Sequence, residues 1–474
     1  MDHWMTMVHG YAFLTVNRQG GPSGEREFES QNHFMLTSMR SLWGGKVSLL
    51  GTFTLEPATI PVRGSAELFQ RGETYRNVLL IDRQHPHDLF VQIAAAWERS
   101  LSQNARIRLY LAPWGEPALG PVAFPHRLSA SENPTAPLSH HNQDSTHIAA
   151  DVATVGLTAS IFTLEGSAFH GREPDENRWD IEQGRLDSWS GRLTARPTRE
   201  LSFQISSGHL EHPESAEPGN QTRSTASVTY QKTTAGGFIA ATAIAGRNRT
   251  KDGPEWGNLL EWTWKFAGKN FLYGRLESVD RDLYELINKR QRPGNVPRER
   301  TLVQAGTLGF VRDVSWFGNV ETGLGGDVTL YSFTSRLDSV YGRRPVSLHG
   351  FVRIRFGSHS GMSDIDHSHM SMQGMAQPPK SPPMPGQPKE MDHSKMSMPG
   401  MDAPAQKAKA PSVSSGEKEM SRGSHQTSTR DPVCGKEVGA SSTYKATYQG
   451  KTYYFCSRAD REKFFSDPTA YVNR

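Results

Sequence analysis

The chain has 474 residues, 35% hydrophobic and 22% charged, which is long enough for two or three domains. Its formal net charge of +4 is too small to indicate a nucleic-acid partner, and we expect none. The longest apolar runs, such as residues 78–81 and 93–97, are far shorter than a membrane-spanning helix. This excludes a helical membrane protein but not a β-barrel, whose strands alternate in polarity.

Cysteine usage and the N-terminus bear on the compartment. Cys434 and Cys456 both lie in the last tenth of the chain, so the preceding residues must fold without disulfides. The N-terminus shows no basic segment followed by an apolar one. Either the protein stays in the cytoplasm, or the printed start lies downstream of an export signal. The barrel interpretation below requires export.

Composition divides the chain into three parts. Residues 1–357 contain segments of alternating polarity separated by turn residues. Residues 358–426 are rich in Pro, Met, Ser, Lys and Gly and contain almost no aliphatic or aromatic side chains, so we expect disorder there. Aromatic residues return after Thr429. We therefore expect a β body (1–357), a disordered linker (358–429) and a small α+β module (430–474).

The body reads as an antiparallel meander of on the order of fourteen strands. In segment 88–97 a short helix competes with a strand. A meander of this size usually closes, because closure removes exposed edges. We therefore expect a mainly β fold with a closed, outer-membrane type barrel of about 12–14 strands. The expected strands are 11–16, 33–42, 46–55, 105–112, 150–164, 186–195, 201–208, 223–231, 237–245, 258–266, 270–279, 302–311, 318–330 and 346–356.

The last expected strand, 346–356, carries the clearest alternation. One face is apolar and suits lipid, and the other is mostly polar and suits a wet lumen. The final Phe resembles the terminal strand of bacterial outer-membrane proteins, and the aromatic residues of 261–277 suit an interfacial girdle. A soluble β-sandwich or barrel remains the alternative, because it also buries one face. The apolar face has Leu348, Gly350, Val352, Ile354 and Phe356, and the other has Ser347, His349, Phe351, Arg353 and Arg355.

The linker contains a ten-residue repeat at 366–375 and 392–401, with eight identical positions. Thioether sulfur is a soft ligand that selects Cu(I), and imidazoles also take Cu(II). The repeat resembles the Asp-His-Ser-x-Met motifs of bacterial copper-resistance proteins, including the outer-membrane protein B family. The alternative is a low-complexity spacer without a metal role. The candidate copper ligands are His367, His369, Met370, Met372, Met375, His393, Met396, Met398 and Met401.

The C-terminal segment predicts a compact module. A Cys turn at Cys434 precedes a hairpin pairing 445–448 with 452–455, and 458–465 follows as a helix. Cys456 lies at the strand–helix junction, where backbone N–H groups favour a thiolate. About 45 residues make little core, so a metal or dense aromatic packing must help.

The motifs Asp-Pro-Val-Cys-Gly, Tyr-Tyr-Phe-Cys-Ser and Asp-Pro-x-x-Tyr resemble those of a YHS domain, a module common in heavy-metal-handling proteins such as copper-transporting ATPases. Lys436 stands where that family often has Met, and Asp460 where it often has a third Cys. Cys434, Cys456 and Asp460 are candidate ligands, with Zn²⁺ as a possible ion. The alternative is a module that has lost its metal and keeps two reduced or disulfide-linked cysteines.

Two loops of the body are rich in histidine. One holds His85 and His87, and the other holds His140, His141 and His147. If the loops converge, they form a His/carboxylate metal site or a proton-coupled constriction. The alternative is separate histidines bonded to backbone or water. The body is also similar to uncharacterised barrel-like proteins found with bacterial metal-resistance systems, which implies no activity.

These patterns favour a non-enzymatic, copper-handling protein of the bacterial envelope. We expect an outer-membrane barrel with a periplasmic metal-binding tail, Cu(I) as the main ion and zinc possible in the module. Its expected partners are metal ions, the outer membrane and other copper-resistance proteins. One alternative is a soluble periplasmic metal chaperone with a β body. Another is a barrel-embedded hydrolase using Ser139 or Ser145 with His141 or His147, although no Gly-x-Ser-x-Gly elbow is present.

Overall fold

The structure is a computed structural model. It describes residues 3–76, 78–215, 219–317, 320–357, 428–439, 442, 444–448, 451–466 and 468–472. The chain divides into two compact units, residues 1–380 and 381–474. Within the ranges described, none of the helices has the length and apolar character needed to cross a membrane.

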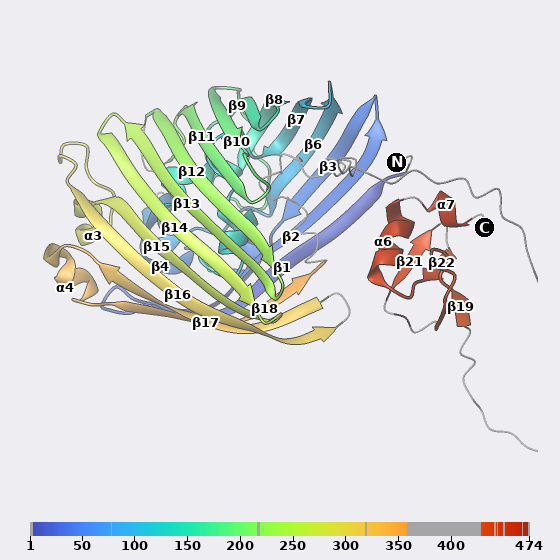
Figure 1. Ribbon diagram of the computed structural model, residues 1–474. Coiled ribbons are helices and arrows are strands. Elements are labelled where there is room, and N and C mark those ends of the chain that lie inside the picture. Colours follow the sequence, from blue (N-terminus) through green and yellow to red (C-terminus); the bar gives the residue numbers. More distant parts are fainter. Residues whose placement is uncertain are drawn as a thin grey trace, which may run out of the picture. The chain divides into compact units, whose positions relative to one another are not determined.

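Sixteen strands of the first unit close into one antiparallel barrel (Figure 1). Neighbours in sequence pair throughout, except that β3 pairs with β6, and β18 closes the barrel on β1. The barrel strands are β1 (Met5–Arg18), β2 (Arg26–Leu42), β3 (Gly45–Phe53), β6 (Phe90–Ser100), β7 (Ala105–Gly115), β8 (Ala149–Ala159), β9 (Phe162–His170), β10 (Ser188–Ala195), β11 (Leu201–Leu210), β12 (Gln221–Thr234), β13 (Gly237–Thr250), β14 (Gly253–Phe266), β15 (Asn270–Asp282), β16 (Arg300–Phe317), β17 (Val320–Ser332) and β18 (Val346–Phe356).

The closed antiparallel barrel confirms the predicted fold class. It has 16 strands, two more than the 14 strands expected from the sequence. The single strand expected at 150–164 is two strands, β8 and β9. They meet in a tight turn at which Ser160 adopts a positive φ of 55°. A positive φ is uncommon for serine, so this residue does not predict the turn from the sequence. The segment 88–97, where a helix competed, contributes to β6.

The barrel is apolar outside and polar inside. On β18, Leu348 is 44% exposed, whereas the neighbouring Ser347 and Arg353 are fully buried. On the other strands, exposed outward side chains include Leu111, Val155, Ile205, Leu276 and Leu324. Their inward side chains are mostly polar, apart from a buried apolar cluster that includes Phe13, Phe238 and Val311. A soluble barrel has the opposite arrangement, because water stabilises polar side chains on its outer face. This inversion is the pattern of a membrane barrel and does not fit the soluble alternative.

The aromatic residues of β14 and β15 divide between the two faces. Trp264 of β14 is exposed on the outer face, as the girdle prediction requires. Phe271 and Tyr273 of β15 are fully buried on the lumen side, so the girdle prediction is wrong for them. Tyr273 Oη donates a hydrogen bond of 2.7 Å to Asp327 Oδ2. The large outward residues of this strand are instead the aliphatic Leu272 and Leu276.

The two ends of the barrel differ in their connections. At the end where β1 begins and β18 ends, the described connections are 43–44, 101–104, 160–161, 196–200, 235–236 and 267–269. At the opposite end they are joined by 19–25, 54–89, 116–148, 171–187, 211–220, 251–252, 283–299 and 333–345. Among them, 283–299 carries α3 (Leu283–Asn288), and 333–345 carries η4 (Ser335–Leu337) and α4 (Asp338–Tyr341). Among the described connections, one end therefore has only short turns, and the other has the long loops.

Two of the long loops, 54–89 and 116–148, fold into the lumen, and we call them the plug. Figure 1 shows β4 and short helical turns enclosed by the barrel strands. Most plug side chains are buried although many are polar. The plug contains α1 (Glu56–Thr59), the hairpin β4 (Ser65–Tyr75) and β5 (Val78–Gln84), η1 (Phe124–His126), η2 (Leu128–Ala130), α2 (His140–Gln143) and η3 (Ser145–His147).

Buried charges join the plug to the barrel wall. Glu132 of the plug forms an ion pair with Arg353 of β18, and both side chains are fully buried. Arg127 Nε lies 2.7 Å from Glu261 Oε1 of β14. Arg281 of β15 donates to the backbone carbonyl of Phe69 at 2.7 Å. Because a buried charge is costly without its partner, these pairs fix the position of the plug in the lumen.

The C-terminal unit is a small α+β module. Its described elements are β19 (Ser428–Arg430), β20 (Glu437–Gly439), β21 (Lys445–Tyr448), β22 (Lys451–Tyr454), α6 (Arg458–Ser466) and α7 (Thr469–Val472). The predicted hairpin and helix are confirmed, β21 pairing with β22 ahead of α6. Phe455 and Phe464 are buried with Ala446 in the centre of the module.

Candidate metal centres

The structure brings two groups of predicted metal ligands together. The first is the lumen cluster, formed by the five predicted body histidines. The second is the module cluster, formed by Asp431, Cys434, Cys456 and Asp460. The repeat residues His367, His369, Met370, Met372, Met375, His393, Met396, Met398 and Met401 lie outside the described residues.

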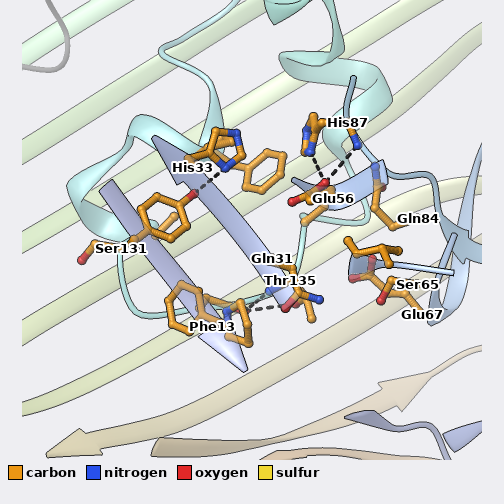
Figure 2. A pocket seen from close by; sticks show the side chains of 18 of the residues that line it. Phe13, Gln31, His33, Glu56, Ser65, Glu67, Gln84, His87, Ser131 and Thr135 are labelled. Atoms are coloured by element: carbon orange, nitrogen blue, oxygen red, sulfur yellow. Dashed lines mark hydrogen bonds and ion pairs between the residues drawn. The ribbon is translucent and has the colours of Figure 1, made fainter. Parts of the chain in front are cut away.

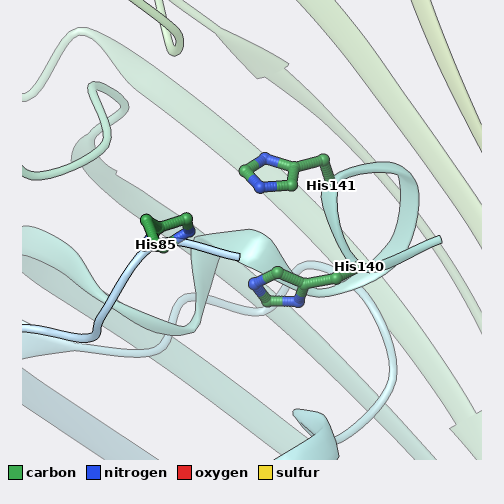
Figure 3. Close-up of side chains that lie close together, drawn as sticks. All are labelled: His85, His140 and His141. Atoms are coloured by element: carbon green, nitrogen blue, oxygen red, sulfur yellow. The ribbon is translucent and has the colours of Figure 1, made fainter. Parts of the chain in front are cut away.

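The lumen cluster forms because two histidine-rich loops of the plug converge. His85 and His87 follow β5, whereas His140 and His141 lie in α2 and His147 in η3. Ring centroids are 5.6 Å apart for His85 and His141, and 5.2 Å apart for His140 and His141. His85, His140 and His141 each offer a ring nitrogen within 4.8 Å of the others. Figure 3 shows these three rings facing a common space.

In four of the five histidines an oxygen holds the Nδ1 atom. His87 Nδ1 lies 2.7 Å from Glu56 Oε2, and His140 Nδ1 lies 2.7 Å from Asp144 Oδ1. His147 Nδ1 lies 2.8 Å from the backbone carbonyl of Asp144. His85 Nδ1 lies 3.2 Å from the Pro86 carbonyl and 3.2 Å from Glu73 Oε1. A carbonyl or ionised carboxylate only accepts, so Nδ1 carries the proton in these rings.

The opposite nitrogens of the same rings are therefore free to bind an ion. The Nε2 atoms of all five histidines are buried and have no hydrogen-bond partner among the residues that the structure describes. Buried polar atoms are normally satisfied, so five unsatisfied imidazole nitrogens in one cluster require an explanation. A proton on Nδ1 leaves a lone pair on Nε2, which is the form that ligates metals.

Burial keeps most of the cluster neutral. It lowers the pKa of His140 to about 4, although Asp144 opposes the shift. Burial, followed by neighbouring imidazoles, also holds the pKa values of His85 and His147 well below the usual range. For His141 burial is outweighed by Glu173 and Glu214, which raise its pKa to about 9. The metal-free cluster therefore has neutral imidazoles beside one imidazolium.

Acidic groups surround the lumen cluster. His141 Nδ1 lies 3.6 Å from Glu173 Oε1 and 3.8 Å from Glu214 Oε1. Sequence analysis did not identify these two carboxylates, nor Glu56 and Glu73. They come from four separate segments: α1, β4 and the loops 171–187 and 211–220. No motif links positions so distant, so a single sequence carries no signal for them.

A pocket between the plug and the barrel wall borders the cluster. Wall residues such as Tyr11 and His33 line one side, and His85 and His87 line the other. Figure 2 shows the Glu56 carboxylate accepting hydrogen bonds from both the backbone and the ring of His87. The cluster is thus buried but adjoins open space in the lumen.

The serines considered for hydrolysis lack a catalytic arrangement. Ser145 Oγ accepts a hydrogen bond of 2.8 Å from Arg223 rather than facing a histidine. Ser139 is fully buried in the plug, away from solvent. The other partner of Ser145 is the Glu173 carboxylate, so neither printed partner is the histidine that the hydrolase alternative requires.

The module cluster combines two thiols with two carboxylates. Cys434 Sγ and Cys456 Sγ are 3.2 Å apart, and Cys456 Sγ is 3.2 Å from Asp460 Oδ2. Asp431 accepts from the backbone N–H of Cys456 at 2.7 Å and of Val433 at 2.8 Å. Two thiols and carboxylate oxygen form a ligand set that suits Zn²⁺.

The prediction that Cys456 is a thiolate is wrong for the metal-free module. The Cys434 thiol and the Asp460 carboxylate raise the pKa of Cys456 to about 12. The backbone N–H of Cys456 donates to Asp431 instead of stabilising sulfur. A bound cation would reverse this preference, because metal ligation deprotonates a thiol.

Comparison with solved structures returns OprB, a porin and OmpT, the last described as an outer membrane protein, each at low sequence identity. OprB of Pseudomonas putida is 10% identical, with a TM-score of 0.44 over 75% of this chain and 94% of that one. OmpT of Vibrio cholerae is 9% identical, with a TM-score of 0.42 over 74% of this chain and 98% of that one. A porin is 12% identical, with a TM-score of 0.39 over 74% of this chain and all of that one.

The C-terminal module matches a known family. No curated protein matches the chain. Residues 429–474 match the YHS domain, and this confirms the resemblance drawn from the cysteine and aromatic motifs. The chain therefore contains a closed barrel of 16 strands with an apolar outer face, and residues 429–474 form a YHS domain.

Proposed function

We propose that this protein binds and handles copper in the bacterial envelope, with its barrel in the outer membrane and its YHS domain in the periplasm. The observation that carries the proposal is the module cluster, in which Cys434, Cys456 and Asp460 meet. Thiolate sulfur binds copper and zinc, and a nearby carboxylate suits zinc. The copper preference rests on the linker repeats, whose thioethers select Cu(I).

The placement of the tail rests on barrel topology. β18 ends at Phe356 at the barrel end that has only short turns. In bacterial outer-membrane barrels the short turns face the periplasm, and the long loops face outward. The chain after residue 357 accordingly continues into the periplasm, where exported copper-resistance proteins would be its neighbours.

The linker and the YHS domain then have different roles, the linker capturing Cu(I) and the YHS domain receiving it. Each repeat supplies three methionines and at least one histidine, a set that wraps a low-coordinate ion. Thioethers bind without losing a proton, so they capture Cu(I) even where thiols stay protonated. The YHS domain offers the stronger thiolate ligands and receives or stores the ion.

The test is a Cu(I) titration of the full chain in detergent against bicinchoninate. Replacing Met370, Met372, Met375, Met396, Met398 and Met401 by Leu should remove about two Cu(I) equivalents, one for each repeat. The matched control replaces Met362, Met384 and Met391, which lie in the same linker outside the repeats. Cys434→Ser with Cys456→Ser should remove a further site. Unchanged stoichiometry in both ligand variants would refute copper binding by the tail.

A further inference from the structure

We propose that His85, His140 and His141 hold a divalent first-row transition-metal ion, such as Zn²⁺ or Cu²⁺, inside the barrel lumen. This site is separate from the tail of the proposed function. It would join the plug segment that follows β5 to the segment that contains α2.

The spacing of the three rings suits a metal site before an ion is bound. One ring nitrogen from each histidine lies within 4.8 Å of the others. In a tetrahedral site with metal–nitrogen bonds of about 2.1 Å, the ligand nitrogens are about 3.4 Å apart. Small side-chain rotations bring the three rings to that distance, and Figure 3 shows them already turned toward one space.

The surroundings of the rings match those of metal-binding histidines. Such histidines donate their second N–H to a carboxylate or carbonyl, which fixes the tautomer and the ring orientation. His140 Nδ1 is bonded to Asp144, and His85 Nδ1 is bonded to the Pro86 carbonyl beside Glu73. His141 Nδ1 faces Glu173 at 3.6 Å. The Nδ1 atom of each proposed ligand therefore faces an oxygen atom.

The unsatisfied nitrogens are the strongest argument. Nε2 of His85, His140 and His141 is buried in each case without a hydrogen-bond partner among the described residues. The same holds for His87 and His147, whose ring centroids lie 6.1 Å from His85 and 5.3 Å from His140 respectively. A single cation would satisfy three such nitrogens at once, with His141 giving up its ring proton as it binds.

Charge and ligand type define the class of ion. The carboxylates of Glu56, Glu73, Asp144, Glu173 and Glu214 surround the cluster, whereas the guanidinium groups paired with or near them are Arg127, Arg178 and Arg223. Once His141 has lost its ring proton, five acidic groups face three basic ones, which favours a divalent cation. The plug segments 54–89 and 116–148 contain neither Met nor Cys. Imidazole without sulfur favours Zn²⁺, Cu²⁺, Ni²⁺ or Co²⁺ over Cu(I).

The site would act as a cross-link within the plug. His85 belongs to the connection between β3 and β6, and α2 belongs to the connection between β7 and β8. A metal bond between them closes a loop in the folded chain, which stabilises the plug against local opening. The ion is thus expected to keep the lumen filled.

The test is Co²⁺ binding to the full chain in detergent, because tetrahedral Co²⁺ absorbs visibly and thiolate ligation adds a separate near-ultraviolet band. His140→Gln with His141→Gln should remove about one Co²⁺ equivalent and its visible band, and leave the thiolate band in place. The matched control, His170→Gln with His209→Gln, changes two half-buried histidines outside the cluster and should leave both bands unchanged.

A third variant distinguishes the loss of a metal ligand from misfolding of the plug. His85→Gln removes a ligand from the other plug segment and should cause the same loss, with circular dichroism showing that the barrel is folded. Folded variants that bind Co²⁺ with the wild-type stoichiometry and spectrum would overturn the proposal. The Cu(I) titration of the linker should be unchanged in these variants. The proposal of a lumen site and the proposed copper binding by the tail are therefore tested independently.

Discussion

The two ligand clusters of this chain differ in how their side chains are held. The lumen histidines are buried, and oxygens hold four of them through Nδ1 within hydrogen-bond distance. The module cysteines are exposed and contact each other at 3.2 Å. The first cluster is therefore organised in advance by the fold, whereas the second is open to solvent and reagents.

The comparison indicates how burial would separate the roles of the two proposed metal sites. A buried site gains affinity from fixed geometry and a low dielectric, but ions reach it slowly. An exposed thiol pair exchanges ligands readily and also reacts with oxidants. A buried site in the plug suits a resident ion, and an exposed site on the tail suits an ion that is passed on.

The largest expected effect is oxidation of the module. Cys434 and Cys456 should form a disulfide with a mild two-electron oxidant such as diamide, because their sulfurs are adjacent and exposed. Both thiolate ligands are then lost, so metal binding by the YHS domain should disappear and return on reduction. Thiol counting together with Zn²⁺ stoichiometry on the full chain checks this.

The matched variant is Cys456→Ser, which cannot form the bond. The metal binding that remains in this variant should be insensitive to diamide. Co²⁺ binding by the lumen histidines should also be insensitive, because the plug segments contain no Met or Cys. Full Zn²⁺ binding by the oxidised wild-type module would contradict the assignment of the cysteines as ligands.

The next effect concerns stability inside the barrel. Glu132→Gln removes the carboxylate that pairs with Arg353 and lies 3.1 Å from Arg355, and all three side chains are buried. Breaking a buried pair leaves charge uncompensated, which costs about 3–5 kcal/mol of unfolding free energy. Urea unfolding in detergent measures the loss.

An exposed ion pair provides the control for this variant. Glu299 pairs with Arg336 in the long loops, where both side chains are more than half exposed. Solvent screens that pair, so Glu299→Gln should leave the unfolding midpoint unchanged. Equal effects of the two substitutions would show that burial does not hold the plug in place.

Much of the barrel could be predicted from alternation alone. On β18 the polar residues Ser347, Arg353 and Arg355 are buried and Leu348 is exposed, as their two-residue period requires. Phe271 and Tyr273 were assigned to the wrong face because aromatic residues occur both in girdles and in packed lumens. The turn at Ser160 was missed because it contains no glycine or proline.

The sites were predictable only where ligands lie close in sequence. Cys434, Cys456 and Asp460 belong to recognisable motifs, and the body histidines occur in two short loops. That the loops meet, and that Glu173 and Glu214 flank His141, depends on how long loops fold into the lumen. Such packing follows from tertiary contacts that no local pattern encodes.

The smallest effect tests whether the oxygens behind the lumen histidines matter for metal binding. Asp144→Asn keeps one oxygen near Nδ1 of His140 but removes the charge that orients and polarises the ring. Changes of this kind lower metal affinity by about 10- to 100-fold. Competition of Co²⁺ binding with a chelator measures the change on the full chain.

A second His–Asp pair separates this effect from a general loss of charge. His170 Nδ1 lies 3.0 Å from Asp187 Oδ2, outside the lumen cluster, so Asp187→Asn should leave Co²⁺ affinity unchanged. Asp144 also pairs with Arg127 at 2.5 Å, so its variant should unfold more easily as well. Lower stability with unchanged affinity would make Asp144 a structural residue of the plug. Lower affinity in a folded barrel would show that it supports the ion through His140.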